Sequence, residues 1–214
     1  MFKIAIIGTG NVGGALAQQL IKAGHLVLLG ARLPLSDKSI SLATKIGMDH
    51  FALPTDSLFK AAATGKLHRN FMGYTSDKTR LLIGLGVSSI SDSWTAFAQN
   101  VKSVEGYLEK VNAGELPVFR GHLLTAEDLV LRQHILNIIC KGKTSWQRED
   151  EQCKSLYSAL EQLEELEHDK LVNIVPFKLK VTTTGKNFVR NICMAFDARL
   201  HRSQPQAQLF SQTV

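Results

Sequence analysis

Residues 7–14 read IGTGNVGG, and this glycine-rich stretch decides how the start of the chain is interpreted. Three of its glycines have the G-x-G-x-x-G spacing of nucleotide-binding loops: Gly8, Gly10 and Gly13. They directly follow an apolar run at residues 2–7, which is typical of a buried parallel strand. Such glycines permit a tight turn, close approach of the backbone to a pyrophosphate, and close packing of the next helix, expected at residues 11–23 and ended by Gly24. The stretch predicts a strand, loop and helix that bind a nucleotide, and the alternative is a glycine turn with a packing role only.

A second expected strand, at residues 26–29, leads to Arg32. Sites that prefer NAD have an acidic residue in this region, whereas an arginine accommodates the 2′-phosphate of NADP. The stretches KIAIIGTGNVGGALA and LLGAR also resemble the opening of the deazaflavin-dependent NADP oxidoreductases, over residues 1–45. The resemblance and the glycine spacing imply NADP(H) as cofactor, with contacts from Gly8, Thr9, Gly10, Asn11, Val12, Gly13 and Arg32.

Composition indicates an ordinary globular protein. The chain has 214 residues, 44% of them hydrophobic, and a formal net charge of +6. It contains no uninterrupted apolar run of the ~18 residues that a membrane span needs, and no pattern of a signal peptide, so we expect a cytoplasmic location. The three cysteines lack C-x-x-C spacing, which favours buried free thiols over disulfides or a zinc site: Cys140, Cys153 and Cys193.

The pattern after Arg32 is not that of a complete dinucleotide domain. Residues 46–52 are expected to form one strand, and loops follow. Further expected elements are helices at residues 125–141, 149–168 and 185–200, and a hairpin formed by residues 171–175 and 179–181. The fold class is therefore an α/β N-terminal part, a partial Rossmann-like βαβ unit, joined to an α+β, mainly helical C-terminal domain whose hairpin is similar to a winged-helix edge.

Five stretches in order resemble the last third of the oxygen-independent coproporphyrinogen III oxidases, from residue 46 to residue 214: IGMDHFALP, LHRNFMGYTS, LLIGLGVSSIS, FRGHLLTAED and TTTGKNFVRNICMAFDARL. In that family a radical S-adenosylmethionine barrel removes hydrogen from propionate side chains of a porphyrinogen on the path to haem. The C-terminal part follows the barrel and helps to cover the substrate. The resemblance implies three parts: residues 1–45, an NADP-binding unit; residues 46–124, the end of the barrel and connecting loops; and residues 125–214, the C-terminal domain.

The resemblance also suggests site residues, each with a simpler alternative. Ile90 would contact S-adenosylmethionine, or it is an ordinary buried isoleucine. Asp49 would bind substrate, or it fixes a loop by hydrogen bonds. Arg69 would pair with a propionate carboxylate, or it forms an internal ion pair with Asp77.

One departure from the family concerns its iron–sulfur cluster, which is held by a C-x-x-x-C-x-x-C motif. No two cysteines of this chain are closer than 13 positions, so the motif is absent and no catalytic residue is assigned. The sequence is interpreted as a chimera that changes family at Lys45–Ile46 and is inactive alone. The alternatives are an NADP(H)-binding oxidoreductase and a non-enzymatic binding module, because a basic helix follows the hairpin within residues 170–202. Expected partners are small molecules, a nucleotide and a porphyrinogen, with neither membrane nor nucleic acid.

Overall fold

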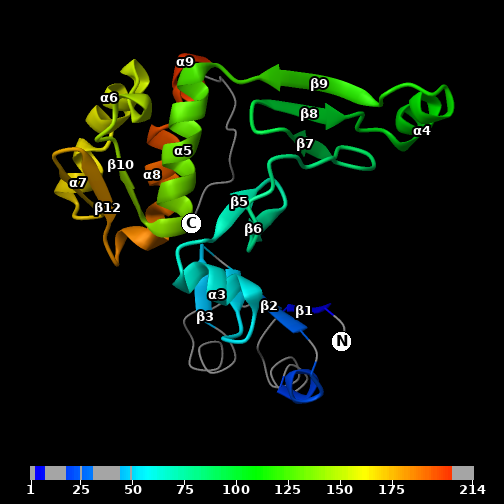
Figure 1. Ribbon diagram of the computed structural model, residues 1–214, viewed down its shortest axis with the longest axis horizontal. Coiled ribbons are helices and arrows are strands. Elements are labelled where there is room, and N and C mark those ends of the chain that lie inside the picture. The colour runs from blue at the N-terminus through cyan, green and yellow to red at the C-terminus, as the bar shows by residue number, and fades with distance from the viewer. Residues whose placement is uncertain (1–2, 8–17, 25, 31–43, 49, 204–214) are drawn as a thin grey trace. The chain divides into compact units, whose positions relative to one another are not determined.

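The computed structural model describes residues 3–7, 18–24, 26–30, 44–48 and 50–203 (Figure 1). The chain divides into two compact units, Met1–His122 and Leu123–Val214, which we describe separately. No helix within the described ranges is both long and apolar enough to cross a membrane.

The first unit begins with a parallel pair of strands, β1 (Lys3–Ile7) and β2 (Leu26–Gly30). Residues 18–22 between them are helical, and Gly24, with φ of 78°, ends this helix as expected. A parallel pair needs a crossover connection, so the predicted strands and the end of the predicted helix agree with a βαβ unit. The glycine loop lies outside the described residues.

The predicted single strand at residues 46–52 is wrong. This part of the chain forms an antiparallel pair, β3 (Thr44–Gly47) and β4 (His50–Ala52). Met48 has a φ of 36°, a left-handed conformation that fits a tight turn, so the chain reverses where the sequence indicated continuous extension. The predicted junction at Lys45–Ile46 therefore falls inside β3.

A small core follows in the same unit. Helix α3 (Ser57–Ala63) begins at Asp56, whose carboxylate accepts a hydrogen bond from the Leu58 backbone at 2.7 Å. Strands β5 (His68–Asn70) and β6 (Gly73–Thr75) then form a second antiparallel pair. The apolar side chains buried here are Phe51, Ala52, Leu53, Ala61, Leu67 and Tyr74.

The last part of this unit is a three-stranded sheet of order β7-β8-β9. Its strands are β7 (Ile90–Asp92), β8 (Ala96–Asn100) and β9 (Val118–Leu123), and helix α4 (Val104–Asn112) lies between the last two in sequence. The segment predicted as loops thus contains short strands. Runs of three to five residues are too short to show the period-2 alternation by which strands are recognised.

The second unit contains the predicted first helix, α5 (Ala126–Lys141). Thr125 and Asp128 form a capping box at its start, and Gly142 ends it in the left-handed conformation. The predicted hairpin is also confirmed: β11 (Val172–Val175) and β12 (Lys178–Val181) pair antiparallel, and β10 (Lys143–Ser145) joins β12 on its other side.

The other two predicted helices of this unit are each interrupted. Instead of one helix at 149–168, the structure has a 3₁₀ turn η1 (Glu149–Glu151), α6 (Lys154–Glu161) and α7 (Glu164–His168). Instead of one helix at 185–200, it has a 3₁₀ turn η2 (Gly185–Phe188), α8 (Val189–Ala195) and α9 (Ala198–Ser203).

Tertiary burial and capping explain these breaks. The chain bends at Leu163 and at Phe196, both of which are almost completely buried. The Asp197 carboxylate then accepts from the Leu200 backbone at 3.0 Å and starts a new helix. The core of the unit consists mainly of Leu131, Ile138, Leu156, Leu163, Leu179, Ile192 and Phe196.

Candidate functional site

The expected NADP(H) contacts, Gly8 to Gly13 and Arg32, lie outside the described residues, and so does Asp49.

Arg69 lies on β5 opposite Tyr74 of β6. Its guanidinium carbon is 4.9 Å from the centre of the Tyr74 ring, a cation–π contact. Its Nη1 atom is buried and has no hydrogen-bond partner within the described structure. A buried donor of a charged group is unfavourable without a partner. Arg69 is therefore suited to bind an anion by donating a hydrogen bond from Nη1.

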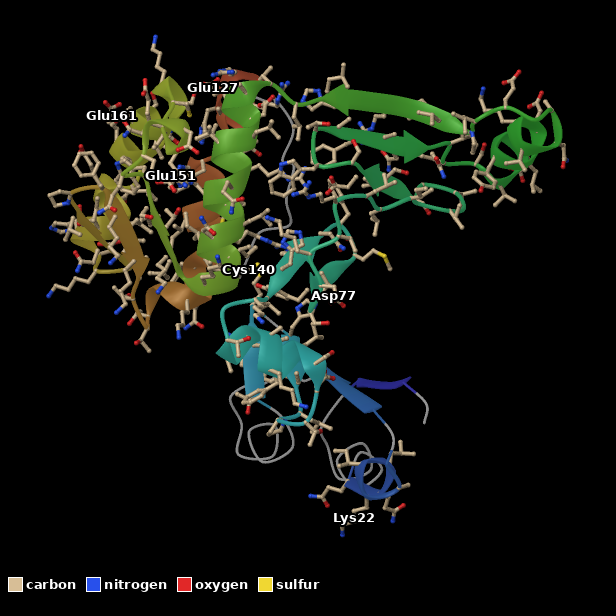
Figure 2. All side chains as sticks on the ribbon, in the orientation of Figure 1. Lys22, Asp77, Glu127, Cys140, Glu151 and Glu161 are labelled. Carbon is tan, nitrogen blue, oxygen red and sulfur yellow. The ribbon has the colours of Figure 1, made fainter. Side chains whose placement is uncertain are left out.

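The alternative expectation for Arg69 was an ion pair with Asp77. Both residues are described by the structure, and they do not form this ion pair. The Asp77 carboxylate instead accepts from the Ser76 hydroxyl at 3.2 Å, and its backbone N–H donates to Thr75 Oγ1. Asp77 is labelled in Figure 2.

Tyr74 brings the two hairpins together. The rings of His50 and Tyr74 meet edge to face, with centres 5.0 Å apart. A Cβ on Gly47 would lie 2.5 Å from the Tyr74 hydroxyl, so the close approach of β3 requires glycine. Arg69, Tyr74 and His50 consequently form one cluster.

A second feature of this unit is a cavity of about 260 Å³. Ile90 lines it and is half-buried. The other lining residues are Phe71, Phe97, Ala98, Gln99, Arg120, Gly121 and His122. The rings of Phe71 and Phe97 meet edge to face at 4.9 Å, and Arg120 Nε donates to Gln99 Oε1 at 2.8 Å.

The loop before Ile90 is held by Asn100, which is 5% exposed. The Asn100 side-chain nitrogen donates to the carbonyls of Gly84 at 3.0 Å and Gly86 at 2.9 Å. The Tyr107 hydroxyl accepts from the Gly86 backbone at 3.0 Å. These contacts fix the loop that presents Ile90 to the cavity. Asn100 and Arg120 could not be predicted from the sequence, because only the pairing of β7, β8 and β9 brings them near Ile90.

The cysteines do not fit an iron–sulfur cluster. Cys140 lies on α5 (Figure 2), Cys153 precedes α6, and Cys193 lies on α8. All three are free thiols, but only Cys193 is buried as predicted, whereas Cys140 and Cys153 are half-buried. Burial raises the pKa of the Cys153 thiol, which disfavours the thiolate that binds iron. Within the described ranges, no three His, Cys, Asp or Glu side chains are arranged to hold a metal ion.

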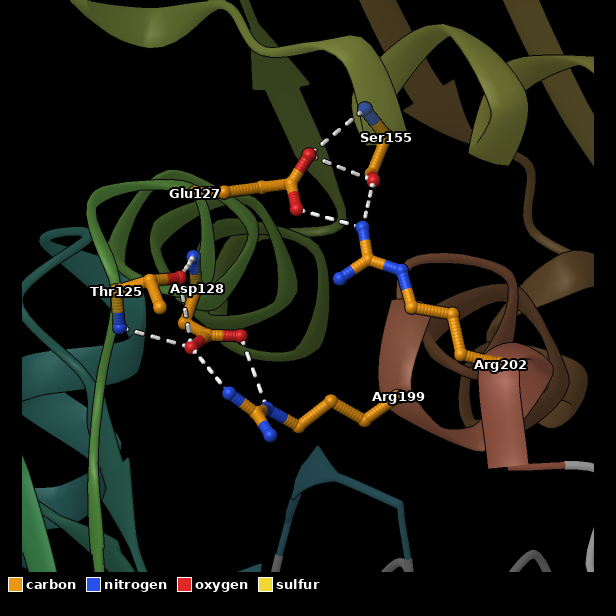
Figure 3. Close-up of polar contacts among 6 residues, drawn as sticks. All are labelled: Thr125, Glu127, Asp128, Ser155, Arg199 and Arg202. Atoms are coloured by element: carbon orange, nitrogen blue, oxygen red, sulfur yellow. Dashed lines mark hydrogen bonds and ion pairs between the residues drawn. The ribbon is translucent and has the colours of Figure 1, made fainter.

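The two arginines of α9 are engaged in ion pairs (Figure 3). Arg199 donates to both carboxylate oxygens of Asp128, at 3.1 and 2.8 Å, and Arg202 donates to Glu127 at 2.6 Å. The Ser155 hydroxyl donates to Glu127 at 2.7 Å. The hydrogen bonds from Arg199 hold the pKa of Asp128 well below its usual range, and those from Arg202 lower the pKa of Glu127. Arg199 and Arg202 thus connect α9 to the start of α5.

Comparisons with known proteins agree with both resemblances. The family model of NADP oxidoreductases, coenzyme F420-dependent, matches residues 3–64. The oxygen-independent coproporphyrinogen III oxidases of Salmonella typhimurium and Escherichia coli are each 35% identical over 208 residues, covering 92% of this chain and 45% of the relative. That of Thermostichus vulcanus is 40% identical over 175 residues, covering 79% of this chain and 53% of the relative. The chain thus spans about half the length of the curated relatives it matches.

The solved structure of coproporphyrinogen III oxidase from E. coli, described as a radical SAM enzyme, matches with a TM-score of 0.72 and 28% identity. The match covers 92% of this chain and 55% of that chain, so the mixture of helices and small sheets is that of the E. coli enzyme. Residues 46–214 resemble the C-terminal part of this enzyme type, and the start resembles the NADP oxidoreductases. The match to the NADP oxidoreductases extends to residue 64, and the match to the coproporphyrinogen III oxidases covers 92% of the chain. The two matches therefore overlap, and neither of them stops at Lys45.

Proposed function

We propose that this chain provides the C-terminal, substrate-covering part of an oxygen-independent coproporphyrinogen III oxidase, which acts in haem biosynthesis by oxidative decarboxylation of coproporphyrinogen III. The observation that carries the proposal is the 35% identity over 92% of the chain. The similarity in fold to the E. coli enzyme supports it independently of any single motif.

Arg69 supports this role by its chemistry. Its buried Nη1 lacks a partner in the described structure, and the substrate of the relatives carries propionate carboxylates. A guanidinium and a carboxylate form strong, directional hydrogen bonds. We assign Arg69 to a propionate of the substrate, and Asp49 remains a second, weaker prediction for substrate binding.

The redox chemistry would come from outside these 214 residues. The three cysteines are unsuited to an iron–sulfur cluster, so the isolated chain should carry none even after anaerobic incubation with iron and sulfide. Bound iron in stoichiometric amount, with the visible absorption of a cluster, would contradict this.

The proposal is tested by a chimera in which residues 46–214 replace the segment of the E. coli enzyme that aligns with those same residues. We expect anaerobic oxidase activity, and a higher KM for coproporphyrinogen when Arg69→Gln is introduced. Arg190→Gln, at an exposed arginine of α8, is the matched control and should leave KM unchanged. A chimera that folds and carries its cluster but neither binds nor oxidises the substrate would refute the proposal.

A second candidate function, NADP(H) binding, is favoured by the family match to residues 3–64 and by the parallel pair β1 and β2. If Arg32 binds the 2′-phosphate, NADPH should bind more tightly than NADH by about 1.5–3 kcal/mol. Arg32→Ala should remove this preference in a nucleotide titration. Equal affinity of the unmodified chain for both nucleotides would contradict the role of Arg32.

A further inference from the structure

The cavity beside Ile90 is large enough for a fragment of a ligand but too small for a whole cofactor. Its volume of about 260 Å³ lies below the roughly 300–1,000 Å³ of pockets that enclose drug-sized ligands. Phe71, Phe97 and Ile90 form its apolar side, and the two phenylalanine rings meet edge to face. Such a surface favours a flat, aromatic ring.

The polar side of the cavity is cationic. Arg120 lines the cavity with Gln99 and His122, and no carboxylate is among the lining residues. Arg120 uses its Nε to donate to Gln99, and no contact of its two Nη groups is recorded within the described structure. Those groups can bind a carboxylate in a forked arrangement.

The site is also preorganised. Gln99 accepts from Arg120 and donates through Nε2 to the Ser88 carbonyl at 3.2 Å, so it ties the cation to the loop that carries Ile90. Asn100 fixes the same loop at Gly84 and Gly86. Groups that are already ordered lose less conformational entropy when a ligand binds.

We propose that this cavity binds a single pyrrole ring and its propionate arm, with the ring against Phe71, Phe97 and Ile90 and the carboxylate on Arg120. The proposal rests on the proposed function, since it states which part of a porphyrinogen this site takes. It assigns a second carboxylate contact in addition to the one suggested for Arg69.

The test is a titration of the full 214-residue chain with 3-(pyrrol-3-yl)propionic acid and with the corresponding propionamide. Binding is followed by calorimetry and by the methyl NMR signals of Ile90. We expect the acid to bind about tenfold more tightly than the amide, because only the acid makes charge-assisted hydrogen bonds. Arg120→Gln should abolish this difference, and Phe97→Ala should weaken both ligands equally. Arg190→Gln, at an exposed arginine outside the cavity, should change neither affinity.

Equal affinity for acid and amide, or an unchanged preference in Arg120→Gln, would overturn the proposal. S-adenosylmethionine is the third probe, and its binding at Ile90 with exclusion of the pyrrole acid would overturn it as well. The outcome is separate from that of the chimera. An active chimera whose Arg120→Gln variant keeps its KM would leave the proposed function intact and refute this site.

Discussion

His134 is buried on α5 and uses both ring nitrogens. Nδ1 lies 2.7 Å from the Thr144 hydroxyl, and Nε2 lies 2.8 Å from the Glu151 carbonyl oxygen. A carbonyl only accepts, so Nε2 carries the proton and Nδ1 accepts from Thr144. The neutral imidazole is therefore fully hydrogen-bonded, and burial lowers the pKa of His134.

This arrangement predicts a loss of stability in mild acid. The pKa of His134 is lower in the folded than in the unfolded state, so the unfolded state binds more protons as the pH falls. The stabilisation is complete above the unfolded pKa of about 6.5 and is lost as the pH falls toward the folded value. Urea unfolding of the chain at pH 7.5 and at pH 5.5 measures the loss in the free energy of unfolding. The buried Trp146 beside His134 is the fluorescent reporter.

The control for this prediction is His134→Gln, which keeps a polar side chain but cannot titrate. It should be less stable at pH 7.5 and should show a smaller loss between the two pH values. If the variant and the unmodified chain lose stability equally, the titrating group is another one.

The Asn100 side chain should contribute measurably to the stability of the first unit. Asn100→Ala should lower the free energy of unfolding of the first unit by about 1–3 kcal/mol, because the two carbonyls lose a buried donor. Asn100→Asp should lower it further, since a carboxylate would face two carbonyl oxygens. Asn112→Ala, at an exposed asparagine ending α4, is the matched control. Urea unfolding compares the three, and equal stability of Asn100→Ala and Asn112→Ala would contradict the role of Asn100.

The helices show what local sequence determined and what packing decided. The start of α5 was predictable, because Thr125 and Asp128 have the spacing of a capping box and need no distant partner. The breaks at Leu163 and Phe196 were not, because neither position has glycine or proline and burial in the core sets the bend. The candidate site followed the same rule. Arg69 and Ile90 came from resemblance, whereas Arg120 joins Ile90 only through strand pairing across β8.

The ion pair between Arg199 and Asp128 attaches α9 to α5. Arg199→Gln removes an ion pair whose arginine is 51% exposed, so it should reduce stability by only about 0.2–1 kcal/mol. Asp128→Ala also removes half of the capping box and should reduce stability by roughly 1–2 kcal/mol. In a double-mutant cycle the two effects should not add, because both include the same ion pair. Additive losses in urea unfolding would show that the pair contributes nothing.

At the scale of the whole chain, the two units differ in how well they bury apolar side chains. Leu123–Val214 has a core with Ile138, Leu156 and Ile192 completely buried. In the other unit, α4 has no buried residue at all. The large apolar side chains that remain exposed between residues 71 and 122 are Phe71, Met72, Leu81, Ile83, Leu85, Val87, Val104, Leu108, Val111, Leu116, Val118 and Phe119. Exposed apolar surface of this extent is typical of an interaction site, and a segment with few buried contacts opens at low free-energy cost.

We therefore expect brief trypsin digestion to cut first within residues 102–120 and to leave a protected fragment that begins near residue 123, where the two units divide. Hydrogen exchange should be fast in α4 and slow in α5 and α8, because only the latter two carry core residues. Ile192→Ala, which should cost about 2–5 kcal/mol in the second unit, should shorten the lifetime of the protected fragment and leave the first cut unchanged. A single cooperative unfolding step, with uniform protection on both sides of residue 123, would show that the units fold as one and that the apolar surface of residues 71–122 is covered in solution.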